Sequence, residues 1–278
     1  MARGLAISNI AWTEADDATV VSELRSMGVA GVEIAPTRRW ARPSEATPGD
    51  IDEYAEFWRS RGTPVVACQA LLYGRDDLRI FADAVAREAT LEYLGVILRL
   101  GARAGARAFV FGSPVNRQVG DLDKASVDAI ALPFFAAAGA LADEAGVSLC
   151  LEPNPPQYKC DFLTTTEECV TFLEHAATPG LGIHLDAAAL TLNGESIEEA
   201  VLLARPFLRH VHASEPYLAP IGSAGVEHAR IAAALASIDY DGWISIEMRA
   251  SPDRPAIDHV RHAVQRTQLD YRAVLEES

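Results

Sequence analysis

The segment CLEPNP (150–155) is a short apolar run that ends in a carboxylate, Glu152, before a proline-rich exit. Three later segments have the same form and end in a metal-binding residue type: GIHLDAAAL (182–190) with Asp186, RHVHASE (209–215) with His212, and WISIEMR (243–249) with Glu247. Successive candidates are 34, 26 and 35 residues apart, roughly one strand plus one helix per step. The pattern predicts parallel strands that each carry one polar group at the end.

Apolar runs and helical patterns alternate along the whole chain. The expected strands are residues 5–12, 29–36, 64–72, 108–113, 148–153, 181–186, 208–213 and 243–248. The expected helices are residues 18–27, 50–61, 78–100, 126–145, 166–176, 197–204, 229–238 and 257–275. Eight alternations predict an α/β fold, a (β/α)8 TIM barrel that forms a single domain over residues 1–278.

Composition narrows the function classes. The chain has 278 residues and a formal net charge of −15, so it lacks the basic footprint of a nucleic-acid-binding protein. Its most apolar helical stretch, residues 132–146, looks too short for a membrane span and carries acids. The amino terminus has no apolar leader and the four cysteines form no CxxC pair. We expect a cytoplasmic protein without nucleic-acid or membrane partners.

In a parallel barrel the carboxyl ends of the strands converge, so Glu152, Asp186, His212 and Glu247 are predicted to bind one divalent cation. Such a mixed carboxylate–imidazole set accepts Mn, Mg, Co or Zn, of which we favour Mn. His184 is expected deeper in the barrel as a hydrogen-bonded core residue. No glycine-rich phosphate loop is present, so no nucleotide cofactor is expected.

Several polar residues on the other strands and loops are candidates for substrate binding. A charge on the second strand, at Glu33, must be paired or functional. Gln69 suits a sugar hydroxyl or a core hydrogen bond, and Arg117 suits a phosphate or carboxylate or a place on the surface. Glu215 suits a substrate hydroxyl, a ligand-orienting role or a salt bridge at the rim. The full candidate set is Glu33, Gln69, Ser113, Asn116, Arg117 and Glu215.

At LEPNP, HLDAAAL, HVHASEP and DGWISIEMR the chain resembles the sugar phosphate isomerase/epimerase superfamily, the xylose-isomerase-like TIM barrels, in its ketose 3-epimerase and inosose dehydratase branch. The resemblance implies the same four metal ligands, with Glu152 and Glu247 as the acid/base pair. It also suggests a homodimer or homotetramer. Two departures argue against a free ketohexose as substrate: Ala189 replaces the usual histidine, and residues 216–219 lack the usual arginine.

These groups suit proton abstraction next to a metal-bound carbonyl. Return of the proton to the other face gives epimerisation, return to the neighbouring carbon gives isomerisation, and loss of a β-hydroxyl gives dehydration. We therefore expect a metal-dependent isomerase or epimerase acting on a small carbohydrate: a sugar, keto-sugar or cyclitol. A lyase, either an inosose-type dehydratase or one that eliminates from a 3-keto glycoside, is the alternative, and a non-catalytic sugar-binding barrel is a third reading.

Overall fold

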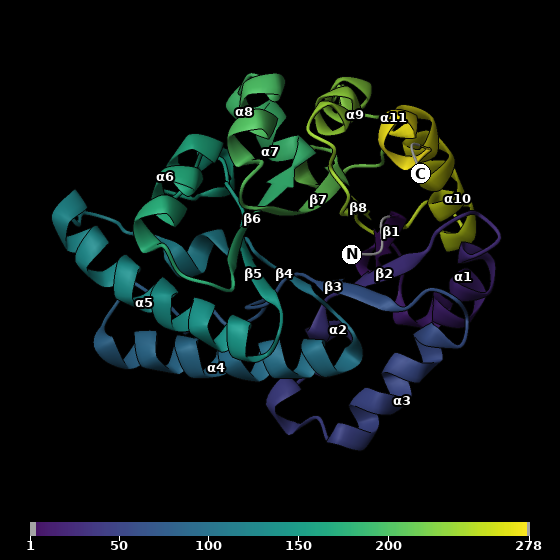
Figure 1. Cartoon of the computed structure of the whole chain (residues 1–278). Helices are drawn as coiled ribbons and strands as arrows, with labels where there is room; N and C mark the ends of the chain where they lie inside the picture. Colours follow the sequence, from purple (N-terminus) through teal and green to yellow (C-terminus); the bar gives the residue numbers. More distant parts are fainter. Residues whose placement is uncertain (1–3, 277–278) are drawn as a thin grey trace.

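The structure, a computed structural model, describes residues 4–276 and contains a closed barrel of eight strands in sequence order. Every neighbouring pair is parallel, including β1 with β8, which closes the ring. Figure 1 shows the strands in the middle of the molecule and the helices around them. The strands are β1 Gly4–Ser8, β2 Gly31–Ile34, β3 Val65–Cys68, β4 Ala108–Phe111, β5 Ser148–Leu151, β6 Leu181–Asp186, β7 Leu208–Ser214 and β8 Trp243–Glu247. The predicted single-domain TIM barrel is confirmed.

The longer helices form the outer layer around the strands and contribute buried apolar side chains to the core. They are α1 Asp17–Leu24, α2 Pro36–Arg39, α3 Pro48–Arg59, α4 Ala84–Ala104, α5 Lys124–Glu144, α6 Thr166–Ala176, α7 Ala187–Asn193, α8 Ile197–Ala204, α9 His228–Ser237, α10 Ala256–Asp270 and α11 Arg272–Leu275. Each predicted helix has a counterpart, while the short helices α2 and α7 were not expected. Both follow a strand directly and lie at the end of the barrel where the predicted site residues are.

Local capping explains one bound that differs from the predicted one, the start of α4. The helix expected over 78–100 begins only at Ala84, because the Asp83 side chain accepts a hydrogen bond from the Ala86 amide and caps the helix there. The apolar residues before it, Leu78 and Ile80, are buried in the preceding loop instead. Hydrophobic side chains in a packed loop therefore resembled a first helical turn.

Helix α5 has 21 residues, close to the expected range 126–145, and it is long and apolar enough to cross a membrane by length and composition alone. The expectation that this stretch is too short was therefore wrong. Its buried side chains, among them Phe134, Phe135 and Ala138, belong to the hydrophobic core of the barrel. Phe135 packs edge-on against Phe111 of β4 at 5.6 Å between ring centroids. The apolar face of α5 thus covers the sheet.

Trp243, the first residue of β8, packs against Gly31 and its neighbours at the amino-terminal end of the barrel. A side chain at Gly31 would place its Cβ 3.1 Å from the Trp243 ring and 2.6 Å from Val66. Only glycine leaves room for this packing. The packing around Gly31 is therefore tight, and the predicted ligand residues lie at the opposite, carboxyl end of the strands.

Candidate metal centre

The four predicted ligands come together at the carboxyl end of β5 to β8. Glu152 directly follows β5, Asp186 ends β6, His212 lies near the end of β7, and Glu247 ends β8. His212 Nδ1 lies 3.7 Å from Asp186 Oδ2 and 3.5 Å from Glu247 Oε2. Ligand atoms of Glu152, Asp186 and His212 lie within 4.8 Å of one another. Donors bound to one cation at about 2.0–2.5 Å each are separated by similar distances.

Asp186 is held by its own strand-to-helix turn. As the cap of α7 it accepts a hydrogen bond from the Ala189 amide through Oδ1 at 2.7 Å. Its Oδ2 accepts a hydrogen bond from the Ser214 hydroxyl, which in turn accepts from the Ala188 amide at 3.1 Å. The carboxylate is therefore fixed in direction, with Oδ2 turned towards His212.

His212 is oriented by Glu33 from the opposite part of the barrel. Its Nε2 is 2.9 Å from Glu33 Oε2, which also accepts the Ser245 hydroxyl at 2.6 Å. Burial raises the pKa of Glu33, but His212 and His210 outweigh it and hold that pKa well below its usual value. An ionised Glu33 favours the proton on Nε2 and leaves Nδ1 facing Asp186 and Glu247. Glu33 is thus engaged with a ligand candidate inside the barrel.

The buried Nδ1 of His212 has no hydrogen-bond partner among the described residues. Burial lowers its pKa, but Glu33 and Glu247 outweigh this and raise the pKa of His212 well above its usual value. The centre therefore attracts positive charge, either a proton or a cation. An unpartnered imidazole nitrogen facing two carboxylates is a donor set that suits a divalent ion.

When no cation is bound, burial and mutual repulsion make the carboxyl groups of Glu152 and Asp186 harder to ionise. Burial, followed by the charges of Asp186 and Glu247, raises the pKa of Glu152 to about 8. Burial and Glu247 likewise raise the pKa of Asp186 to about 6. A bound cation would offset both effects, because it stabilises the ionised carboxylates.

His184 differs from its sequence-based interpretation. It is fully buried on β6, and neither ring nitrogen has a hydrogen-bond partner among residues 4–276, so the expected hydrogen-bonded core role is not observed. One of its ring nitrogens lies within 4.8 Å of the ligand atoms of Glu152, Asp186 and His212. Burial, then His212 and His210, lowers its pKa well below the usual value, so the ring is neutral. His184, two residues before Asp186 on β6, therefore adds a further candidate ligand nitrogen to this set.

Glu152 is positioned by residues whose role was not evident in the sequence. Its Oε2 accepts a hydrogen bond from Asn154 at 3.0 Å, and its backbone carbonyl accepts one from Arg117 at 2.6 Å. Gly112 lies so close that a Cβ there would be 2.2 Å from Glu152 Oε2. Arg117 is completely buried, which corrects the surface alternative considered for it.

The remaining substrate-binding candidates are mostly occupied by protein contacts. Asn116 donates to the carbonyls of Arg75 and Leu78 at 2.8 and 2.7 Å, and Gln69 donates to Ser8 at 2.8 Å. The Glu215 carboxylate accepts the amides of residues 222 and 224 at 2.7 and 3.2 Å and lies 3.2 Å from His228. Ser113, at φ +42°, stays partly exposed at the end of β4.

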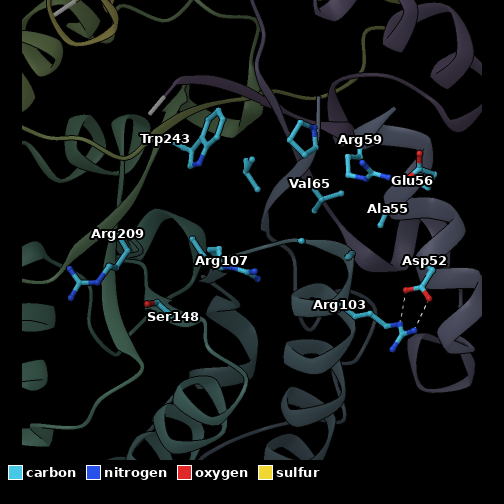
Figure 2. Close-up of a pocket in the computed structure, with 15 residues that line it drawn as sticks. Asp52, Ala55, Glu56, Arg59, Val65, Arg103, Arg107, Ser148, Arg209 and Trp243 are labelled. Carbon is cyan, nitrogen blue, oxygen red and sulfur yellow. Dashed lines mark hydrogen bonds and ion pairs between the residues drawn. The ribbon is translucent and has the colours of Figure 1, made fainter. Parts of the chain in front are cut away.

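A cavity of about 620 Å³ lies at the other end of the barrel. Figure 2 shows Arg107 near its centre and the Arg103–Asp52 ion pair at one side. Val65, Ala108, Ser148 and Trp243, which line it, are the first residues of their strands. Among the described residues around it there is no histidine, and Asp52 is paired with an arginine. The acid/base and ligand groups are therefore at the opposite end.

Fold and site together define a (β/α)8 barrel with a candidate metal centre at the carboxyl end of its strands. Residues 21–268 match the family model of the xylose isomerase-like TIM barrels. The chain therefore belongs to the xylose isomerase-like TIM barrel family. No curated protein sequence matches it significantly.

Solved structures share the fold at low sequence identity. D-psicose 3-epimerase, solved in the presence of D-fructose, has a TM-score of 0.81 and 17% identity, covering 96% of this chain and 99% of that chain. L-ribulose 3-epimerase has a TM-score of 0.80 and 18% identity, covering 100% and 97%. The 3-keto-D-glucoside 4-epimerase from E. coli has a TM-score of 0.79 and 17% identity, covering 96% and 99%.

Proposed function

We propose that this protein is a divalent-metal-dependent isomerase or epimerase that acts on a sugar, keto-sugar or cyclitol. The observation that carries the proposal is the convergence of two glutamates, from β5 and β8, on the buried Asp186–His212 pair. The Glu247 side chain is 14% exposed and Glu152 is partly exposed, whereas Asp186 and His212 are buried. The two glutamates are therefore the members of the set that a substrate can reach.

Glu152, Asp186, His212 and Glu247 would hold the ion, for which Mn is favoured and Mg, Co or Zn are compatible. A divalent ion at this position would polarise a substrate carbonyl and acidify the adjacent C–H. One glutamate then removes that proton, and the other returns a proton from the opposite side. In the metal-free protein, burial and two negative neighbours favour a protonated Glu152, an effect that a bound cation would offset.

The activities of the structural neighbours support this proposal. They include two 3-epimerases of ketoses and a 4-epimerase of a 3-keto glucoside. We propose a small-molecule carbohydrate as substrate, a homodimer or homotetramer as the assembly, and a cytoplasmic location. A lyase acting on an inosose or a 3-keto glycoside begins with the same proton abstraction and is the alternative. A sugar-binding barrel without catalysis is the third candidate.

Metal analysis of the purified protein, followed by incubation of the metal-loaded protein in D₂O with a panel of ketoses, inososes and 3-keto glycosides, tests the proposal. Deuterium incorporation next to the carbonyl with an epimerised or isomerised product is the expected result. Elimination products would favour the lyase. Absence of both from every member of the panel would refute catalysis by this centre.

A further inference from the structure

Two tyrosines from different loops meet at the carboxyl end of the barrel. Tyr158 ends the short turn Pro156–Tyr158 after β5, and Tyr217 lies in the turn Pro216–Leu218 after β7. Their ring centroids are 5.5 Å apart with an interplanar angle of 74°, and the Tyr217 amide donates to the Tyr158 hydroxyl at 3.1 Å. Because β6 lies between β5 and β7, this pair bridges the strand that carries Asp186.

The pair lies in loops that follow β5 and β7, at the same end of the barrel as the candidate metal centre, and it is open to solvent at Tyr217. The Tyr217 side chain is 62% exposed, while Tyr158 is partly buried. Burial, followed by the charges of Asp186, Glu247 and Glu152, raises the pKa of Tyr158 to about 12. Its hydroxyl therefore stays protonated. It accepts from Tyr217, and among the described residues its own proton has no acceptor.

The backbone that presents Tyr217 is strained. Tyr217 and the next residue, Leu218, have φ of +61° and +59°, a conformation that non-glycine residues rarely adopt. The turn is held by the Leu218 carbonyl, which accepts the Arg249 amide at 2.9 Å, and by the Tyr158 hydroxyl. Several contacts thus fix a large apolar ring in an exposed position.

Three of the polar side chains predicted to bind substrate are already engaged by protein contacts. The amide groups of Asn116 and Gln69 donate to other protein atoms, and both oxygens of Glu215 accept loop amides. An acyclic polyol, which is recognised through many hydrogen bonds, would not find partners in these three side chains. A flat aromatic ring instead matches the C–H face of a six-membered ring.

We propose that Tyr217 and Tyr158 form the substrate-contacting surface and that they select a carbohydrate in ring form, a pyranoside or a cyclitol, over an acyclic sugar. The ring packs on Tyr217, and the Tyr158 hydroxyl donates to one of its oxygens. The inference rests on the proposed function, because the bound carbohydrate is taken to be the substrate. The preference for a ring form can be tested by binding alone, without catalysis.

The test uses two probes without a carbonyl, methyl β-D-glucopyranoside and the acyclic alditol D-glucitol, with the magnesium-loaded protein and saturation-transfer NMR. The glucoside should bind more tightly than D-glucitol. Tyr217→Ala and Tyr217→Gly should weaken its binding about tenfold, whereas Tyr217→Phe keeps it. The glycine variant tolerates the positive φ and so guards against misfolding. Leu202→Ala, at a position that is also 62% exposed, is the matched control.

Equal binding of the glucoside by wild type and both truncated variants would overturn the inference, as would tighter binding of D-glucitol or no binding of either probe. Tyr217-dependent binding without any deuterium exchange would refute the proposed function and leave this inference standing. Exchange into D-fructose that is undiminished in Tyr217→Ala, with no exchange into ring ketones, would keep the proposed function and overturn the inference.

Discussion

Glu33 on β2 and His212 on β7 are joined by a contact of 2.9 Å across the interior of the barrel. The first half of the chain thereby sets the direction in which a ligand candidate of the second half points. Because Nε2 faces an ionised carboxylate, Nδ1 is the nitrogen left for a cation. The orientation of the His212 ring therefore depends on Glu33, a residue outside the four predicted ligands.

Glu33→Gln tests this dependence. The amide keeps the size of the side chain but removes the charge that fixes the His212 ring, so affinity for Mn²⁺ should fall about 10–100-fold while the barrel stays folded. Calorimetric titration of the metal-free variant measures it. Ser245→Ala, which removes only a hydroxyl that donates to Glu33, should have a smaller effect. Unchanged affinity in Glu33→Gln would separate Glu33 from metal binding.

Asp186→Ala and His212→Ala should reduce metal occupancy by at least about 100-fold, because each removes a donor and leaves the remaining carboxylates to repel one another. Elemental analysis after dialysis against a defined free Mn²⁺ concentration gives the occupancy. His175→Ala, at an exposed histidine on α6, serves as the control and should match wild type. Full occupancy in both site variants would contradict the shared metal centre.

Glu152→Gln and Glu247→Gln should lower turnover on the order of 100-fold or more with a much smaller loss of metal, since the amide retains an oxygen ligand but cannot act as a base. Metal content and turnover must be measured on the same preparations. Near wild-type turnover in both variants would remove these glutamates from the proton-transfer mechanism.

The raised pKa of Glu152 predicts how the metal-free protein responds to pH. Burial and negative neighbours lift the pKa from 4.5 to about 8, so between these values the folded state keeps a proton that the unfolded chain has lost. The free energy of unfolding then falls as pH rises, by up to about 1.4 kcal/mol per pH unit. The Glu152→Gln variant has no ionisable group at this position, so its free energy of unfolding lacks this pH dependence. Thermal melts of both metal-free proteins should give similar melting temperatures near pH 4. The melting temperatures should diverge up to pH 8.5, with the variant more stable. A difference in melting temperature that does not change with pH would be inconsistent with the raised pKa.

Gly112→Ala should displace Glu152, because the added Cβ would lie 2.2 Å from its Oε2 and 3.2 Å from Asn154 Nδ2. We expect a destabilisation of about 1–3 kcal/mol and a clear loss of activity. Gly49→Ala on α3 is the control, since its Cβ would meet only Thr47 at 3.8 Å. Denaturant unfolding and turnover compare the two, and wild-type behaviour of Gly112→Ala would show that Glu152 has room to move.

The fold could be predicted from the sequence, and so could the clustering of Glu152, Asp186, His212 and Glu247. Both follow from local patterns: the alternation of strands and helices, and the position of a polar residue at the end of a strand. It did not reveal the partners of polar loop residues. Whether Asn116 meets a substrate or a backbone carbonyl depends on how the loops fold back. The contact between Tyr158 and Tyr217 likewise joins loops 59 residues apart, which no local pattern encodes.

The closing strand has a consequence for biosynthesis. Glu247 is the last residue of β8, and β8 pairs with both β7 and β1. A nascent polypeptide that has emerged only as far as β7 already contains Glu152, Asp186 and His212, yet it lacks Glu247, the fourth candidate ligand, and cannot close the barrel. Proteins are synthesised from the amino terminus, so the proposed set of four ligands is complete only after β8 has been translated. Prematurely terminated products would consequently be poor competitors for the cell's pool of divalent ions.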